Sequence, residues 1–278
     1  MSRNILFIVE GEDLEPAFIK QMADLYKLDY EITSVRTNIH NLYSKLKDGD
    51  GFLDVKIVLK EILQKIIDSL RLQEATVTLQ EKIEQIAFEI GNLDKSFESI
   101  YLIFDSELHD SVPPGVSQME GVQKNYNQLK EMIDFFDNET EQGKLYVNYP
   151  MMESYRDCDD FFDEQYKNRE VSLDVLFRRK YKEQVGKRRL ANCHIDKINR
   201  KSFDKLTCMN IFKLNEITTK HWRKMLYDNF IEKSNQRNVL EAEYAYICER
   251  EAVAVLNTTF FFMIDFFGRK FYNSLRQD

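Results

Sequence analysis

The sequence is poor in the residues that mark disulfide scaffolds, membrane spans and structureless linkers. It has four cysteines, four prolines and nine glycines in 278 residues. The cysteines are far apart and form no Cys-x-x-Cys pair, which excludes a zinc-ribbon pattern and a disulfide framework. The longest apolar stretch, AVLNTTFFFMIDFFG, is interrupted by polar residues and is shorter than the ~20 residues of a membrane-spanning helix.

The N-terminal segment also lacks the features of a targeting signal. Its residues, MSRNILFIVEG, include one basic side chain, a very short apolar stretch and no small-residue cleavage site. This pattern argues against a secretory signal peptide. We therefore expect a cytoplasmic protein that does not associate with a membrane.

Positive charge is scarce relative to negative charge. The chain has 39 lysine and arginine residues against 47 aspartate and glutamate residues, a formal net charge of −8. This balance argues against a protein that coats nucleic acid through a basic surface. It is compatible with a nuclease, because a site that gathers carboxylates for Mg²⁺ is locally negative until the metal binds.

Two strongly apolar segments end in acidic residues. Residues 4–9, NILFIV, are followed at once by Glu10, and residues 100–104, IYLIF, lead into Asp105 and Glu107. Continuous apolar runs of this length are typical of strands that are covered on both faces of a parallel sheet. The sequence therefore predicts two buried strands with carboxylates at their ends.

Helical and strand patterns alternate along the first 160 residues. After the first strand they predict, in order, a helix to residue 26, a strand over 29–36, a helical insertion over about 38–97, the second buried strand, a helix over 122–136 and a strand over 144–150. This order is typical of an α/β domain, a parallel sheet flanked by helices. We predict such a catalytic domain over residues 1–160 and a mainly helical domain, accessory or binding a substrate or partner, over residues 161–278.

The acidic strand ends predict a metal site. The carboxyl ends of parallel strands meet at one edge of a sheet, so Glu10, Asp105 and Glu107 are expected to lie together. Carboxylates brought together repel one another unless a hard cation binds between them. We predict that these three residues bind Mg²⁺ or Mn²⁺, that Glu10 can also act as a general acid or base, and that Glu153, after the third strand, is a further catalytic carboxylate.

Two nearby residues are candidate helpers. Glu15 follows Glu10 closely, and His109 lies four residues after Asp105. An imidazole titrates near neutrality, so His109 is suited to proton transfer, although a surface loop is the alternative interpretation.

A basic stretch, FRRKYKEQVGKRRL, is the candidate nucleic-acid interface. Its basic residues are Arg178, Arg179, Lys180, Lys182, Lys187, Arg188 and Arg189. Such a stretch, interleaved with aromatic residues, can hold a phosphate backbone. A solvated helix face offset by neighbouring acids is an equally good interpretation.

The segments VEG…E and FDSE resemble the motifs of the Toprim domain, the Mg²⁺-binding module of topoisomerases, primases and several nucleases. In that family a glutamate follows the first strand and an Asp-x-Asp pair follows a later strand. Glu10 and Asp105 match these positions, whereas residue 107 is Glu in place of Asp.

A further segment, LYVNYPMMESY, is similar to the Asn-x-Pro-x-x-Glu region of Toprim proteins in bacterial anti-phage systems. These include OLD-type nucleases, RloB-like proteins and the Toprim partner of the PARIS system. This resemblance implies that Glu153 is a site carboxylate and that Asn148 shapes the adjoining loop. It covers about the first 160 residues.

Resemblance to these families implies a toxic, metal-dependent nuclease in anti-phage defence, controlled by an ATPase of the ABC or AAA type. DNA and RNA, transfer RNA included, are candidate substrates. The chain has no G-x-x-x-x-G-K-[ST] phosphate loop, so the ATPase is expected to be a separate protein.

Two questions stay open at the level of sequence. The alternative function is a non-catalytic, Toprim-like regulatory or binding subunit of an ATPase complex, which uses the helical insertion to contact its partner. Assembly into a homo-oligomer is neither indicated nor excluded.

Overall fold

The computed structural model describes residues 4–48, 51–74, 76–110, 112–113 and 115–276. The chain forms two compact units, and each is built from discontinuous segments. The first unit comprises Met1–Leu102 and Phe136–Lys144, and the second comprises Ile103–Phe135 and Leu145–Asp278. Contacts rather than sequence order define these units, so the functional division into residues 1–160 and 161–278 stays a prediction.

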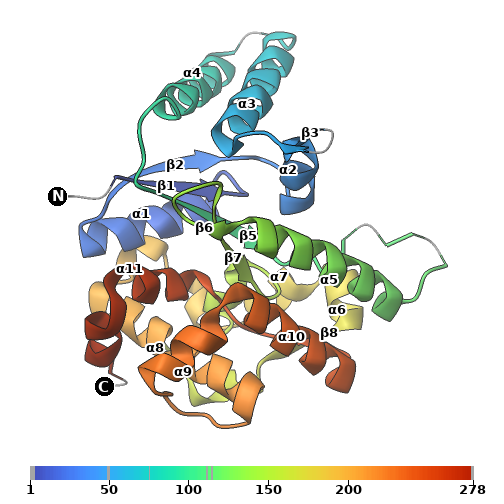
Figure 1. Ribbon diagram of the computed structural model, residues 1–278, viewed down its shortest axis with the longest axis vertical. Helices are drawn as coiled ribbons and strands as arrows, with labels where there is room; N and C mark the ends of the chain where they lie inside the picture. The colour runs from blue at the N-terminus through green and yellow to red at the C-terminus, as the bar shows by residue number, and fades with distance from the viewer. Residues whose placement is uncertain (1–3, 49–50, 75, 111, 114, 277–278) are drawn as a thin grey trace. The chain divides into compact units, whose positions relative to one another are not determined.

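The protein has an α/β fold with a mostly parallel five-stranded sheet flanked by helices (Figure 1). The strand order is β2-β1-β5-β7-β6. The bounds are Asn4–Val9 for β1, Asp29–Ser34 for β2, Ser99–Asp105 for β5, Asp137–Asn138 for β6 and Gly143–Asn148 for β7. The prediction of an α/β class with a largely parallel sheet is confirmed.

The parallel pair β1 and β2 carries the first acidic strand end. Its register runs from Asn4 opposite Asp29 to Val9 opposite Ser34. Helix α1 (Leu14–Tyr26) connects the two strands and buries Phe18 and Ile19. A helical crossover of this kind is what parallel neighbours require. Helix α1 ends at Lys27, which adopts the left-handed conformation with φ 57°.

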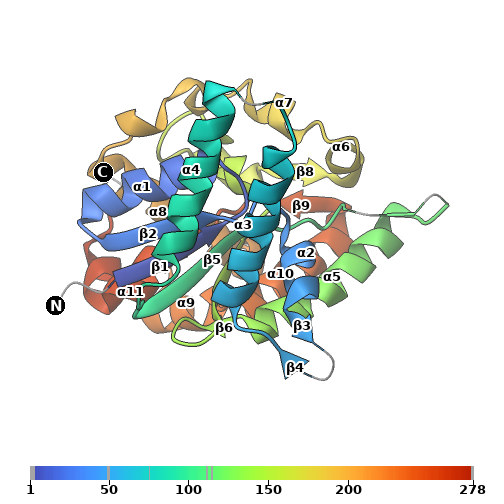
Figure 2. The same ribbon diagram turned by 90° about the horizontal axis from the view of Figure 1, so that it is seen from above.

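The predicted insertion consists of three helices and a small hairpin. Its elements are α2 (Ile39–Leu46), β3 (Lys47–Asp48), β4 (Gly51–Phe52), α3 (Val55–Arg71) and α4 (Val77–Asn92). Helices α3 and α4 lie side by side (Figure 2) and have Asp54 and Thr76 as N-caps. Helix α3 buries one face, whereas several apolar residues of the pair stay exposed, namely Ile57, Leu72, Val77 and Phe88.

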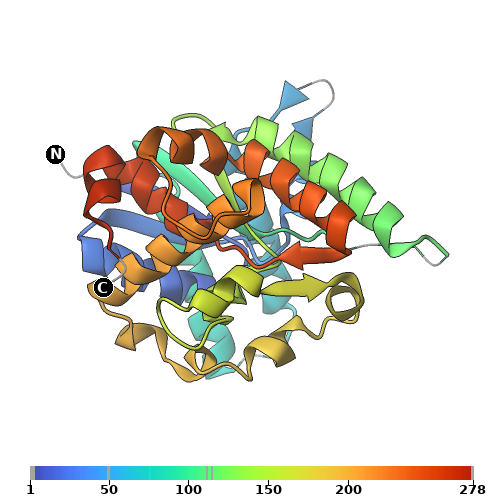
Figure 3. The same cartoon turned by 90° about the horizontal axis from the view of Figure 1, so that it is seen from below.

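The second unit is mainly helical (Figure 3). Its helices are α5 (Gln118–Phe135), α6 (Leu173–Phe177), α7 (Tyr181–Val185), α8 (Arg200–Thr219), α9 (Tyr227–Ser234), α10 (Gln236–Arg250) and α11 (Thr259–Ser274). Short 3₁₀ helices cover Met152–Arg156, Glu164–Asn168, Leu190–Asn192 and Ile195–Lys197, and the strands β8 (Glu170–Ser172) and β9 (Ala252–Ala254) form an antiparallel pair.

The apolar segment AVLNTTFFFMIDFFG belongs to the core of the second unit. It supplies the end of β9 and the first part of α11, and its residues Val255–Ile264 are buried. Polar side chains inside this segment, Asn257 and Thr259, are buried too, because they hydrogen-bond to the chain around β7. Among the described residues, no helix has the length and apolar character to cross a membrane.

Candidate metal centre

The first acidic loop begins where β1 stops. Backbone bonds continue past the strand, since the N–H groups of Val35 and Arg36 donate to the carbonyls of Val9 (2.9 Å) and Glu10 (3.0 Å). The Ser34 hydroxyl donates to the carbonyl of Gly11 at 2.6 Å. The main chain on both sides of the Glu10 side chain is therefore fixed by the segment that follows β2.

Glu15 lies against the turn at Gly11. A Cβ atom on Gly11 would stand 2.5 Å from Oε2 of Glu15, so a glycine lets the carboxylate approach the backbone. Glu15 occupies the first turn of α1, where a negative charge favours the helix dipole. Its role as a catalytic helper stays a prediction.

Asp105 is the last residue of β5, and its carboxylate is held by the main chain. Its Oδ1 accepts a hydrogen bond of 2.7 Å from the N–H of Met152. The carbonyl of Met152 in turn accepts from the buried Asn257 side chain at 3.0 Å. The N–H of Met152 thus orients one oxygen of the Asp105 carboxylate.

Glu107 stands in a strained, half-buried turn. Its φ is 48°, a left-handed conformation that residues other than Gly and Asn seldom adopt. Burial raises the pKa of its carboxyl, and the nearby Asp110 raises it further, against the opposing charges of Arg179 and Lys182. The site therefore disfavours the charged form of Glu107 unless a cation is close.

Asn125, which the sequence analysis missed, holds this turn. Its buried side-chain amide on α5 donates to the carbonyls of Glu107 (3.3 Å), Leu108 (3.1 Å) and Asp110 (2.7 Å). A sequence signal for it existed, because Asn125 is a polar residue on the buried face of an otherwise amphipathic helix.

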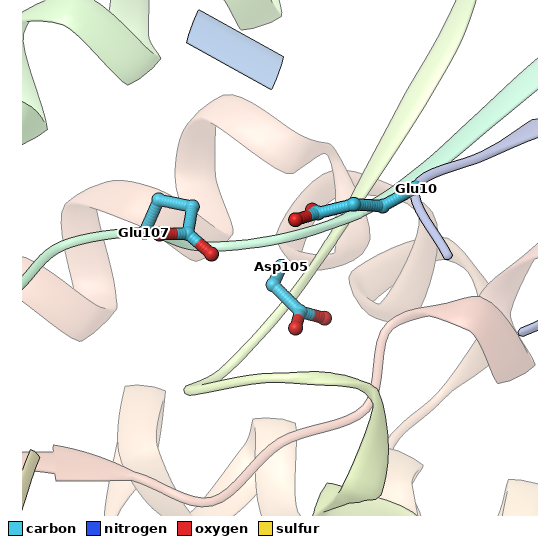
Figure 4. Close-up of side chains that lie close together, drawn as sticks. All are labelled: Glu10, Asp105 and Glu107. Atoms are coloured by element: carbon cyan, nitrogen blue, oxygen red, sulfur yellow. The ribbon is translucent and has the colours of Figure 1, made fainter. Parts of the chain in front are cut away.

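The three predicted ligands come together. Glu10, Asp105 and Glu107 each offer one carboxylate oxygen, and these atoms lie within 4.8 Å of one another. In Figure 4 the side chains of Glu10 and Glu107 extend toward each other, and Asp105 lies between them. Among the described residues, this is the group of His, Cys, Asp and Glu side chains placed to share a metal ion.

The donor set suits a hard cation. Mg²⁺ binds oxygens at about 2.0–2.1 Å, so two ligands on opposite sides of it are about 4.2 Å apart. Oxygens within 4.8 Å of one another need only a sub-ångström adjustment to meet such an ion. Ligands made only of carboxylate oxygens favour Mg²⁺ or Mn²⁺ over the metals that prefer nitrogen or sulfur.

Glu153 lies beside this loop and not in the group of three. It belongs to the 3₁₀ helix Met152–Arg156, and its carboxylate forms an ion pair of 2.7 Å with Lys182. The backbone of its neighbour Met152 binds Asp105. Glu153 therefore connects the basic stretch to the segment that holds Asp105, and its catalytic role stays a prediction.

The basic stretch 178–189 divides into paired and unpaired cations. Ion pairs join Arg178 to Asp174 (2.8 Å), Arg179 to Asp110 (3.7 Å), Lys182 to Glu153 (2.7 Å) and Arg188 to Asp157 (2.8 Å). Within the described chain, Lys180, Lys187 and Arg189 are exposed and form no ion pair. The paired cations fit the interpretation of a solvated helix face offset by neighbouring acids, and the nucleic-acid interface stays a prediction.

His109 is half-buried between the acidic turn and the basic stretch. Its ring contacts Phe177 edge-on, with the centroids 6.4 Å apart. Burial lowers its pKa, and the charge of Arg179 lowers it further, although Asp110 acts in the opposite direction. The surroundings of His109 therefore favour the neutral imidazole over the charged form, and its role in proton transfer stays a prediction.

Asn148 belongs to the scaffold behind Asp105. Its side-chain N–H donates to Oγ1 of Thr259 at 3.0 Å, and its side-chain oxygen accepts from the N–H of Thr259 at 3.3 Å. Its main-chain carbonyl accepts from the N–H of Ser106 at 3.0 Å. The side chain is fully buried. These bonds fix the end of β7 next to the residue that follows Asp105.

Comparison with protein families, with curated proteins and with solved structures finds no match to this chain. The resemblance to the Toprim domain consequently rests on sequence motifs alone, at Glu10, Asp105 and the segment around Glu153, and stays an expectation.

Proposed function

We propose that this protein is a nuclease that depends on Mg²⁺ or Mn²⁺ and hydrolyses phosphodiester bonds in nucleic acid, built on a Toprim-like domain. The observation that carries the proposal is the meeting of three carboxylate oxygens, from two distant strand ends, within 4.8 Å. Carboxylates this close together repel one another, and a divalent cation bound between them removes the repulsion.

Glu10, Asp105 and Glu107 would hold the ion, and a bound Mg²⁺ supplies Lewis-acid polarisation and a more acidic water. Asp105 keeps its orientation through the N–H of Met152. Burial raises the pKa of Glu107 and lowers that of His109, so burial moves the pKa values of these two neighbouring groups toward each other.

In this proposal the basic stretch binds the phosphate backbone of the substrate. Arg179 is 77% exposed at its side chain and lies 3.7 Å from Asp110, next to the acidic turn. Lys180, Lys187 and Arg189 extend the exposed positive charge. Cations beside a negative site attract the phosphate backbone locally although the whole chain carries a net charge of −8.

The resemblance carries three further parts of the proposal. The substrate is DNA or RNA, with transfer RNA among the candidates. The activity serves anti-phage defence, and a separate ABC-type or AAA-type ATPase controls it. These parts rest on the motif residues Glu10, Asp105 and Glu153.

The direct test incubates purified protein with plasmid, single-stranded DNA and total transfer RNA in Mg²⁺, Mn²⁺ or EDTA. Glu10→Gln and Asp105→Asn remove ligand charge with little change of shape, and Asp13→Asn is the matched control. Asp13 is an exposed acid three residues from Glu10 whose side chain makes no capping bond. Cleavage in EDTA, or in both ligand variants, contradicts the proposal.

The exposed apolar residues of α3 and α4 favour the second candidate, a non-catalytic subunit that docks onto a partner. Ile57, Leu72, Val77 and Phe88 are exposed on this helical pair, and exposed apolar groups of this kind mark interaction surfaces. A protein that binds Mn²⁺ but cleaves none of the substrates above would support this candidate.

A further inference from the structure

The side chain of Arg36 is buried, and its contacts stabilise the first acidic loop, residues 10–12. Its guanidinium is 9% exposed and donates to Glu12 Oε1 at 2.6 Å and to Glu89 at 2.9 and 3.2 Å. It also donates to the carbonyl of Ser34 at 2.7 Å. A buried charge of this kind is tolerated only with such a complete set of partners.

The Arg36 backbone is engaged at the same place. Its N–H donates to the carbonyl of Glu10 at 3.0 Å, and its φ of 59° turns the chain so that the side chain reaches Glu12. Arg36 thus contacts the main chain of one predicted ligand and the side chain two residues further on. Together with the Ser34 hydroxyl on Gly11, it fixes residues 10–12 from one side.

Helix α4 belongs to the same network. Glu89 of α4 is 8% exposed, accepts both bonds from Arg36 and also accepts from the N–H of Ser34 at 3.3 Å. A second residue of α4, Lys82, donates to Glu12 at 3.0 Å from a more exposed position. The helical insertion is therefore connected by charged groups to the loop that carries Glu10.

Arginine suits this position better than lysine. Its planar fork serves two carboxylates and a carbonyl at once, whereas an ammonium on a flexible stem holds such partners less rigidly. The network holds both oxygens of Glu12, because Arg36 donates to Oε1 at 2.6 Å and Lys82 donates to Oε2 at 3.0 Å.

We infer that Arg36 and Glu89 are positioning residues that set the affinity of the Glu10 loop for its metal, and that α4 acts on the site through them. This inference rests on the proposed function. Partners behind metal ligands typically change metal affinity by about 10–100-fold when they are removed. A displacement of α4 would change metal affinity by the same route.

The test measures Mn²⁺ affinity of the full chain by calorimetry for Arg36→Lys, Glu89→Gln and the control Glu81→Gln. We expect affinity to fall by about tenfold or more in the first two variants. Glu81 is an exposed glutamate of the same helix, so the affinity of Glu81→Gln is expected to stay within about fivefold of wild type. Thermal unfolding without metal, measured alongside, identifies any variant that is merely unfolded.

Amide hydrogen exchange over residues 9–13 in metal-free protein gives an independent readout. Exchange is expected to rise in Arg36→Lys and Glu89→Gln and not in Glu81→Gln. The inference is overturned if exchange over residues 9–13 is unchanged in both variants. It is also overturned if the wild type binds Mn²⁺ and both variants bind it with the same affinity. Raised exchange in a protein that never binds Mn²⁺ supports the positioning role and overturns the proposed function alone.

Discussion

The two acidic loops of this protein are held by different chemistry. The loop after β1 is fixed by charged groups, since Arg36 binds Glu12 and Glu89. The carbonyls of the loop after β5 and the Asp105 carboxylate accept from neutral donors, namely the Asn125 amide and the N–H of Met152, and the exposed Arg179 adds an ion pair of 3.7 Å with Asp110. The first loop therefore depends more on an ion-pair network with α4, and the second depends more on uncharged groups inside one compact unit.

This difference teaches where each loop is vulnerable. Ion pairs respond to salt, to charge-changing substitutions and to movement of the partner helix. Neutral hydrogen bonds to buried carbonyls respond instead to loss of the donor, because an unsatisfied carbonyl is costly. Predictions that compare the two loops follow from this contrast.

The largest effect is expected at the ligands themselves, one from each loop. Glu10→Gln and Asp105→Asn should each lower the cleavage rate by at least about 100-fold, the usual size for a group that stabilises charge in a transition state. Rates measured at saturating Mn²⁺ check this. A loss confined to one of the two variants would break the equivalence of the loops.

The second-largest effect is expected when the side-chain amide of Asn125, the neutral donor of the second loop, is removed. Asn125→Ala leaves three carbonyls of the second loop without their donor. We expect about 1–3 kcal/mol of lost stability, measured by urea unfolding, and weaker Mn²⁺ binding. The matched control is Gln128→Ala, at an exposed position of the same helix. An equal loss of stability in that variant would contradict a specific role of the Asn125 amide.

A substitution at Glu107 is expected to have a smaller effect, and to raise the stability of the metal-free protein where the Asn125 substitution lowers it. Its pKa is raised by burial first and by Asp110 second, so the folded state binds this proton more tightly than the unfolded chain does. The stabilising contribution of protonation is complete below the ordinary pKa of 4.5 and is lost as the pH rises through the raised value.

Metal-free Glu107→Gln should consequently be more stable than wild type at pH 7, by about 1 kcal/mol, the usual scale of a single substitution. The same variant should lose most of the rise in melting temperature that Mn²⁺ gives to wild type. Melting curves at pH 5 and pH 7, with and without Mn²⁺, check both signs. A destabilised Glu107→Gln at pH 7 without metal would show that the buried charge is compensated.

The smallest effect is expected at the exposed cations beside the second loop. Lys180→Ala should weaken binding of single-stranded DNA evenly across sequences and reduce the slope of log affinity against log salt by about 1. Arg178→Ala, whose cation is already paired with Asp174, is the control and should change the slope less. If the slope of log affinity against log salt is the same in both variants, the substrate does not bind at Lys180.

The strands that carry the site were predictable because they are long and continuously apolar. Residues 4–9 form β1 with the predicted bounds, and 100–104 lie within β5. The pairs β3–β4 and β8–β9 were missed, since strands of two or three residues show no periodicity. Predicted strand 29–36 ends at Ser34, because Arg36 turns into a left-handed conformation to make its ion pairs.

Within the site, the carboxylates could be predicted and their supports could not. Glu10 and Asp105 stand at strand ends, a position that the sequence shows directly. Arg36 and Glu89 are 53 residues apart, and only the tertiary fold reveals that they meet. A pattern of local periodicity cannot identify such a pair, because each residue alone is an ordinary charged position.

The bond between Asn148 and Thr259 has a consequence for the order of events during synthesis. Thr259 is made 111 residues after Asn148, so a growing chain that already displays Asp105 lacks the partner that fixes the end of β7. If the proposed function holds, the edge of the sheet beside Asp105 would be completed only when this later segment folds back onto it, and activity would start no earlier than that step.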